Sequence, residues 1–113
     1  METKDLGRTS TGIQPNVAAL LSYLLGWITG LIFYLIEKDN KFVRFHALQS
    51  IVVFAGFTVI AIVLVFIPVI GLALLPILYL AELVLWIVLM IKAFQGETFK
   101  LPIAGDIAEK NAH

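Results

Sequence analysis

The chain has 113 residues, of which 60% are apolar and 14% charged, whereas about a quarter of the residues in a soluble domain are charged. Its eight basic residues balance its eight acidic ones, so no net field attracts nucleic acid or an acidic substrate. Because the chain has no cysteine, disulfide frameworks, thiolate nucleophiles and cysteine-based zinc sites are excluded.

The first long apolar segment follows a polar N-terminal stretch. Residues 1 to 16 lack apolar periodicity, so we expect a flexible tail that ends near Asn16, a candidate helix cap. Residues 17 to 36 carry no charge, and at about 1.5 Å per residue a helix of this length crosses roughly 30 Å of hydrocarbon. The run is longer than the apolar core of a signal peptide, so we expect it to be retained as a first membrane span.

A polar loop, residues 37 to 46, separates this segment from the next one. Asp39 or Asn40 can cap the helix that follows by accepting a hydrogen bond from a backbone amide two or three residues later. Arg44, His46 and Gln49 form either a solvated, lipid-facing rim or a candidate interaction site at the cytoplasmic edge of the membrane.

Metal ligation by the same loop is the weaker alternative. It would use Glu37, Asp39 and His46, but lysines interleave the carboxylates and no ligand spacing repeats. We therefore assign no metal-binding residue.

The second apolar region extends from residue 47 to 91 and contains one charge, Glu82. As a single helix it would be about 68 Å long, roughly twice the thickness of a membrane, so it must fold back. The sequence "IPVIG", residues 67 to 71, predicts the reversal, because Pro68 ends helices and Gly71 can adopt the positive φ of a tight turn.

These segments predict an all-α integral membrane helical bundle with three transmembrane helices, at about 17–36, 44–67 and 73–93, within a membrane domain of residues 17 to 95. A soluble bundle is the alternative, but its helices should each have a polar face, and residues 17 to 36 and 47 to 81 have none. After the third helix, residues 96 to 113 are expected to form an interfacial or cytoplasmic tail that is loosely ordered.

The distribution of basic residues predicts an orientation for three spans. The loop and the C-terminal tail share one side, and the N-terminus lies on the other with only Lys4 and Arg8. By the positive-inside rule the 37–46 loop and the C-terminus are cytoplasmic and the N-terminus is outside the inner (cytoplasmic) membrane. The basic residues on the loop side are Lys38, Lys41, Arg44, Lys92, Lys100 and Lys110.

Two features inside the spans are candidates for a specific role. Ser22, Gly26 and Gly30 recur every four residues, which favours close packing within the bundle or against a second copy; a ligand path is the other interpretation. Glu82, near the middle of the last span, is either a proton relay or cation site, or a neutral carboxyl hydrogen-bonded to Ser22, Thr29 or a tyrosine.

The stretches "TSTGIQPNVAALLSYLLGWITGLIFYLIEKDNKFVRFHALQS" (9 to 50) and "IKAFQGETFKLPIAGDIAEK" (91 to 110) resemble a family of small bacterial and archaeal membrane proteins of unknown function. That family is distantly grouped with the Tic-twenty subunit of the chloroplast import machinery and with the magnetosome proteins MamF and MmsF. The resemblance implies a helical membrane protein without established enzymatic activity, and it carries over no catalytic residue.

Three functional classes follow. We favour a scaffold or accessory subunit of a membrane complex, in contact with the lipid bilayer and with a second copy or another membrane protein, without a cofactor or nucleic acid. The alternative is an oligomeric transporter or protein-import-type pore that uses Glu82. A membrane enzyme is the weakest, because no metalloprotease or serine-hydrolase motif, acid/base carboxylate pair or nucleotide loop is present.

Overall fold

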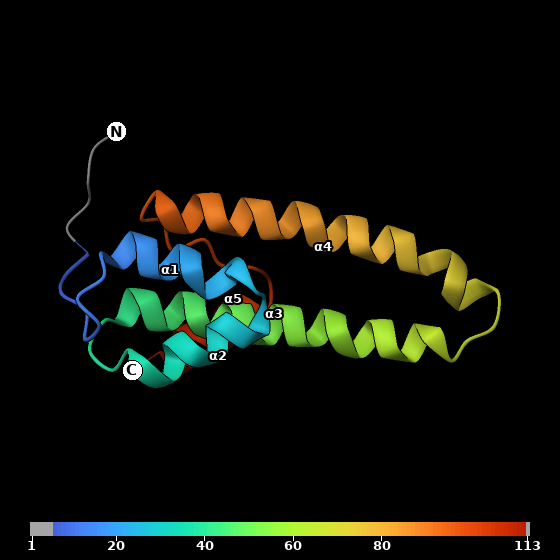
Figure 1. Ribbon diagram of the computed structural model, residues 1–113, viewed down its shortest axis with the longest axis horizontal. Helices are drawn as coiled ribbons and strands as arrows, with labels where there is room; N and C mark the ends of the chain where they lie inside the picture. Colours follow the sequence, from blue (N-terminus) through green and yellow to red (C-terminus); the bar gives the residue numbers. More distant parts are fainter. Residues whose placement is uncertain (1–5, 113) are drawn as a thin grey trace.

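The computed structural model describes residues 6 to 112, so Lys4 and the outer part of the N-terminal tail lie outside the described residues. The described chain is helical, and its two longest helices run along the long axis of the molecule (Figure 1). In chain order the helices are α1 (Pro15–Leu24), α2 (Trp27–Ile36), α3 (Lys41–Val65), α4 (Ile70–Phe94) and α5 (Ala104–Asn111).

The predicted span at residues 17 to 36 is wrong, because the segment forms a hairpin of two short helices. Gly26, with a φ of 66°, is outside the helical region and lies in the two-residue turn between the end of α1 at Leu24 and the start of α2 at Trp27. The Thr29 hydroxyl stabilises the turn by accepting from the Leu25 amide at 3.1 Å and donating to the Ser22 carbonyl at 3.1 Å. Each helix has 10 residues, or about 15 Å, so neither crosses a bilayer.

The two other predicted spans are confirmed as helices long and apolar enough to cross a membrane. α3 and α4 have 25 residues each, about 38 Å, and they lie antiparallel (Figure 1). Only 17% of the most apolar window of α3, and 6% of that of α4, is buried inside the chain. A core helix of a soluble protein would be mostly buried, so this exposure favours a lipid environment.

The reversal between α3 and α4 occurs within the predicted residues, but a different residue takes the unusual backbone conformation. Val69, with a φ of 64°, makes the turn, whereas Gly71 already belongs to α4. Gly71 is needed there for space, since a Cβ atom would overlap the carbonyl oxygen of Leu64.

The expected placement of the N-terminus and the 37–46 loop on opposite sides of the membrane is contradicted by their contacts. The Ser10 amide donates to both carboxylate oxygens of Glu37, at 2.9 and 2.8 Å, and the Ser10 hydroxyl donates to Asp39 at 2.8 Å. The N-terminal segment and the α2–α3 loop therefore lie on the same side. The physical reason is the hairpin of α1 and α2, which returns the chain to the end where it entered (Figure 1).

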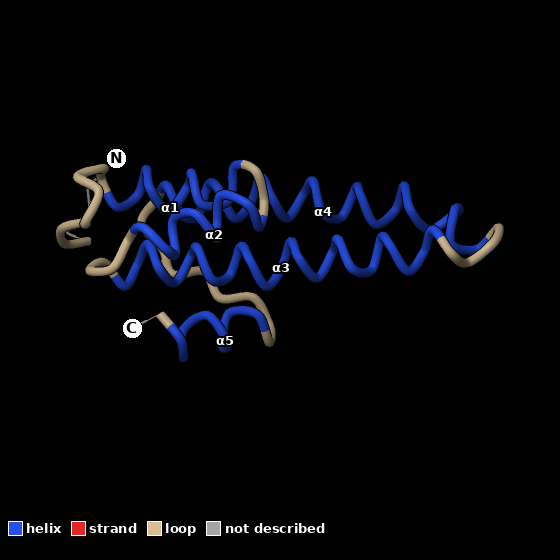
Figure 2. The backbone as a smooth tube through the Cα atoms, turned by 60° about the horizontal axis from the view of Figure 1, so that its bottom comes forward, coloured by secondary structure: helices blue, strands red, loops and turns tan. Residues whose placement is uncertain are grey.

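The C-terminal tail is more ordered than expected. Residues 104 to 111 form α5, which lies beside the first half of α3 (Figure 2). Ala108 and Ala112 contact Phe45 in a small apolar cluster, and Lys100 forms ion pairs with Asp106 at 3.3 Å and Glu109 at 3.1 Å. The tail is thus a packed helix on the surface of α3.

Two parts of the molecule can now be distinguished. The charged end comprises residues 6 to 14, 37 to 46 and 92 to 112, which include α5. Together with α5, the helices α1 and α2 cover the first half of α3. The outer hairpin comprises residues 58 to 84 of α3 and α4, where Gly71 alone is buried. The core therefore lies in the half of the molecule that is next to the charged end.

Candidate functional site

A chain of buried polar side chains connects α1 to α3 beside the charged end. Gln49 Nε2 donates to the Tyr23 hydroxyl at 3.0 Å, and that hydroxyl lies 2.6 Å from His46 Nδ1. His46 Nε2 lies 2.9 Å from the Glu97 carbonyl oxygen. Because a carbonyl only accepts, Nε2 carries the proton and Nδ1 accepts from Tyr23, which assigns a neutral imidazole.

The same cluster clamps the segment after α4. Gln49 donates to the Phe99 carbonyl at 2.9 Å and accepts from the Leu101 amide at 3.0 Å. Tyr23, His46 and Gln49 have no exposed surface. The two sequence-predicted interaction residues His46 and Gln49 thus direct their hydrogen bonds to backbone atoms of residues 97 to 101, inside the chain.

Arg44, the third residue of that predicted set, also contacts its own chain. Its Nη1 donates to the carbonyls of Tyr34 at 2.9 Å and Glu37 at 2.6 Å, and its guanidinium lies 4.1 Å from the centre of the Tyr34 ring. Charge-assisted and cation–π contacts of this kind fix the end of α2 against α3.

Glu37 connects two parts of the charged end, the N-terminal segment and its own loop. Its carboxylate accepts from the backbone amides of Ser10, Asp39 and Asn40, and it has no exposed surface. Burial raises the pKa of the Glu37 carboxyl, but these hydrogen bonds outweigh burial and hold the pKa below its usual value of 4.5.

Asn40 is the helix cap predicted for this loop, and the metal alternative has no counterpart in the structure. Asn40 Oδ1 accepts from the Val43 amide at 3.1 Å, which confirms one of the two predicted caps. Within residues 6 to 112, no group of three or more His, Cys, Asp or Glu side chains could hold a metal ion.

The small residues of the first segment lie against α3 of the same chain. A Cβ atom on Gly30 would lie 2.8 Å from the Ala47 carbonyl oxygen, and one on Gly26 would lie 3.4 Å from the Phe54 Cβ. Ser22 is buried and donates to the Ala18 carbonyl at 3.0 Å. Gly26 and Gly30 therefore lie close to α3 of the same chain, whereas the hydrogen bond of Ser22 stays within α1.

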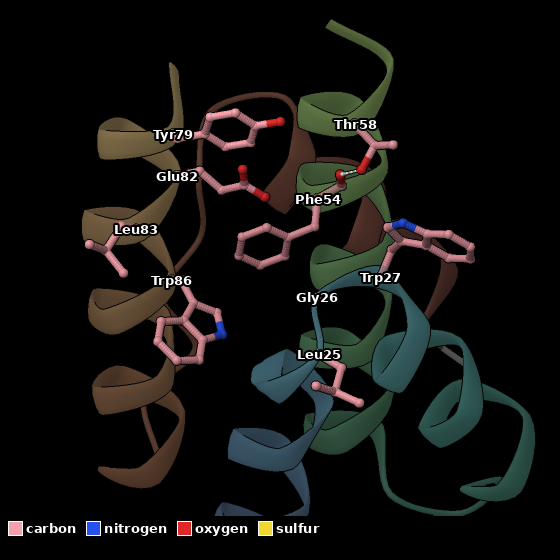
Figure 3. Close-up of a pocket in the computed structure, with 9 residues that line it drawn as sticks. All are labelled: Leu25, Gly26, Trp27, Phe54, Thr58, Tyr79, Glu82, Leu83 and Trp86. Carbon is pink, nitrogen blue, oxygen red and sulfur yellow. Dashed lines mark hydrogen bonds between the residues drawn. The ribbon is translucent and has the colours of Figure 1, made fainter. Parts of the chain in front are cut away.

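A cleft of about 370 Å³ opens where the α1–α2 turn meets α3 and α4, and Glu82 lies in it (Figure 3). Figure 3 shows the Glu82 carboxyl directed from α4 toward α3. Among the described residues, this carboxyl has no hydrogen-bond or ion-pair partner; Ser22 and Thr29 bond to backbone atoms instead. The lining residues are Leu25, Gly26, Trp27, Phe54, Thr58, Tyr79, Glu82, Leu83 and Trp86.

Helical spacing in the sequence already places Tyr79 and Trp86 beside Glu82, but it gives no sign of Trp27 and Phe54. Trp86 lies one turn after Glu82 on α4, and its indole donates to the Tyr23 carbonyl at 2.7 Å. The place of Trp27, at the start of α2, depends on the unpredicted turn at Gly26.

The model of the magnetosome magnetite crystal formation protein family matches residues 11 to 108, which include both the buried cluster and the Glu82 cleft. The chain belongs to this family. A membrane protein of Methanocaldococcus jannaschii in the UPF0132 group is 52% identical over 105 residues, which cover 93% of this chain and 94% of the relative. One from Archaeoglobus fulgidus is 54% identical over 98 residues, covering 87% and 95% respectively.

A second Methanocaldococcus jannaschii relative is 48% identical over 99 residues, covering 88% of this chain and 71% of its own length. No solved structure matches the chain. These family members are membrane proteins by name, which agrees with the two long, exposed, apolar helices α3 and α4. The protein is therefore a membrane protein of the magnetosome magnetite crystal formation family.

Proposed function

We propose that the protein acts as a scaffold or accessory subunit of a membrane complex, and not as an enzyme, with the charged end as the surface that partners bind. One observation carries this proposal. Three segments far apart in the sequence are joined at the charged end by Ser10, Glu37 and the clamp of His46 and Gln49. Ordering a loop before it binds lowers the entropic cost of association, so a prearranged surface suits a constitutive partner.

The composition of the surface supports a polar partner. Exposed side chains of both signs lie close together on it, whereas Glu82 is the single Asp, Glu, Lys or Arg residue of the outer hairpin. Mixed charges give orientation and specificity to an interface rather than strong nonspecific attraction. The exposed charged residues are Arg8, Lys38, Asp39, Lys41, Lys100, Asp106, Glu109 and Lys110.

Site-specific photocrosslinking tests the subunit role. A photoreactive side chain at Lys38 or Lys110, both exposed, should give a covalent adduct with a second copy or another membrane protein in native membranes. The matched control is Val69, which is 79% exposed at the tip of the outer hairpin. Adducts from Lys38 and Lys110 no more abundant than those from Val69 would count against the proposal.

The positive-inside rule applied to the observed topology suggests that the charged end is cytoplasmic and that the protein resides in the inner membrane. The described basic residues cluster at this end, and the turn at residues 66 to 69 carries no charge. Single cysteines at Arg8, Lys38 and Lys110 should therefore label from the cytoplasmic side, and one at Val69 from outside. Labelling of Arg8 and Lys38 from opposite sides would contradict this topology.

A second candidate function is an oligomeric transporter or protein-import-type pore, and the observation that favours it is the unpaired carboxyl of Glu82 inside a cleft. Carboxyls at membrane depth are common in substrate and ion pathways. Flux through reconstituted vesicles that Glu82→Gln abolishes would support this candidate, and flux that the variant leaves unchanged would remove Glu82 from it.

A further inference from the structure

Glu82 is an unusual residue for its position in the molecule. It lies midway along the 25-residue helix α4, so in a bilayer it is near the centre of the hydrocarbon. An ionised carboxyl without a partner is strongly unfavourable at that depth. An ionised Glu82 therefore needs a positive partner close to it.

The described chain does not supply that partner. Among residues 6 to 112, no basic side chain lines the cleft. The two long helices carry three basic residues, all at the charged end: Lys41 is exposed there, Arg44 donates to the carbonyls of Tyr34 and Glu37, and Lys92 pairs with Glu97 at 3.1 Å. An ionised Glu82 would therefore take its counter-charge from outside the described residues.

The walls of the cleft indicate which kind of cation fits. Four aromatic side chains line it together with Glu82: Trp27, Phe54, Tyr79 and Trp86. The face of an aromatic ring attracts a cation most strongly when both are away from water. Figure 3 shows Tyr79 and Phe54 beside the Glu82 carboxyl, Trp86 farther along α4, and Trp27 at the opposite end of the cleft, at the start of α2.

A small metal ion fits this lining poorly. Hard cations such as Ca²⁺ take six to eight oxygen ligands. The lining offers the carboxyl of Glu82 and two hydroxyls, and the hydroxyl of Thr58 already donates to the Phe54 carbonyl at 2.8 Å. An organic cation, whose charge is surrounded by carbon, matches the aromatic walls better.

The size of the cleft and the exposure of its rim limit which ligands it can hold. A volume of about 370 Å³ lies within the range of small-molecule sites. Tyr79 and Leu83, at the rim, are 55% and 48% exposed on the side of the molecule that lipid covers. A neighbouring hollow of about 240 Å³ between α3 and α4 shares Thr58, Tyr79 and Glu82 with the cleft. The ligand enters from hydrocarbon, so it must be lipophilic.

We propose that the Glu82 cleft is a binding site for a lipophilic organic cation, a positively charged centre that carries aromatic or alkyl groups. Glu82 supplies the counter-charge, and Trp27 and Trp86 supply the aromatic walls. This inference goes beyond the subunit role and does not depend on it, because crosslinking at the charged end and binding in the cleft are separate observations.

Intrinsic fluorescence offers a direct test, because both tryptophans of the chain line this cleft. The full chain in detergent or lipid nanodiscs is titrated with tetraphenylphosphonium, and triphenylphosphine oxide serves as the uncharged analogue of similar shape. We expect saturable quenching by tetraphenylphosphonium, with an affinity at least about tenfold above that for the oxide.

Two isosteric variants assign the effect to Glu82. Glu82→Gln removes the charge without changing the shape, and we expect it to weaken tetraphenylphosphonium binding at least about tenfold. Glu109→Gln makes the same change on α5, outside the cleft, and should leave binding unchanged. Trp86→Phe, which keeps an aromatic wall, should retain binding and lose part of the quenching signal.

The proposal has definite ways to fail. Absence of saturable quenching in the folded natural chain would overturn it, as would equal affinities for the cation and the oxide. Equal tetraphenylphosphonium affinity in Glu82→Gln and the natural chain would also overturn it, even if quenching is observed, since the ligand would then be held by apolar contact alone.

Discussion

The same two helices have very different surroundings along their length. In the half beside the charged end, α3 is covered by α1, α2 and α5 and contains the buried residues His46, Gln49 and Ser50. In the outer hairpin, residues 58 to 84, only Gly71 is buried. The half next to the charged end is organised by its own hydrogen bonds, whereas the outer hairpin depends on the bilayer to cover it.

This contrast explains why similar apolar side chains contribute differently to stability in the two halves of the α3–α4 hairpin. Hydrocarbon covers apolar faces about as well as protein does, so burial between helices adds little driving force within a membrane. Close backbone contact and polar bonds must then hold the covered half together. Substitutions should therefore be costly there and mild in the outer hairpin.

The largest effect is expected from Gly30→Leu. A side chain at Gly30 would collide with the Ala47 carbonyl and with Ser50, forcing α2 away from α3. We expect a loss of about 3 kcal/mol or more in the free energy of unfolding, measured by thermal or denaturant unfolding in detergent. Gly56→Leu is the matched control on α3, because nothing lies within 4 Å of a Cβ there. Equal destabilisation by both variants would contradict the contrast.

Gln49→Leu should have the next largest effect. It leaves the Leu101 amide and the Phe99 carbonyl without their partner, at a cost of about 2 to 3 kcal/mol. Faster amide hydrogen exchange in residues 97 to 101 should accompany the loss of stability. The control is Thr58→Val, which removes a hydroxyl that bonds only within its own helix, and should cost less than about 1 kcal/mol.

A smaller, pH-dependent effect is expected at Glu37. Since its folded pKa lies below the usual 4.5, ionised Glu37 stabilises the fold at neutral pH, and the contribution is lost as the pH falls through the folded pKa. Glu37→Gln should therefore cost about 1 to 2 kcal/mol at pH 7 and progressively less in acid. A cost that stays constant below pH 4.5 would contradict this assignment of the carboxylate.

The sequence predicted α3 and α4 well because their length and lack of charge leave few alternatives. It predicted the cap at Asn40 for the same kind of local reason. The α1–α2 hairpin could not be predicted, since Gly26 and Thr29 occur in an apolar run that suits one continuous helix equally well. The error in the side of the N-terminus followed directly from that misassigned turn.

The Glu82 cleft and the buried polar cluster also differ in how far the sequence predicts them. Glu82 was recognisable because a charge in a long apolar run is rare. The bonds of His46 and Gln49 depend on residues 97 to 101, about fifty positions away, and no local pattern indicates that contact. The described residues belong to a single chain, so they do not test contacts between molecules. Such contacts therefore stay predictions for Arg44, His46, Gln49, Ser22, Gly26 and Gly30.

The hairpin of α1 and α2, which enters and leaves at the charged end, makes the molecule broad at that end and narrow at the tip of the outer hairpin (Figure 1). In a bilayer it therefore occupies more area in one leaflet than in the other. Such a wedge fits best where the membrane bends so that the leaflet around the charged end is the more expanded one. We therefore expect this shape to favour membranes that curve in that direction.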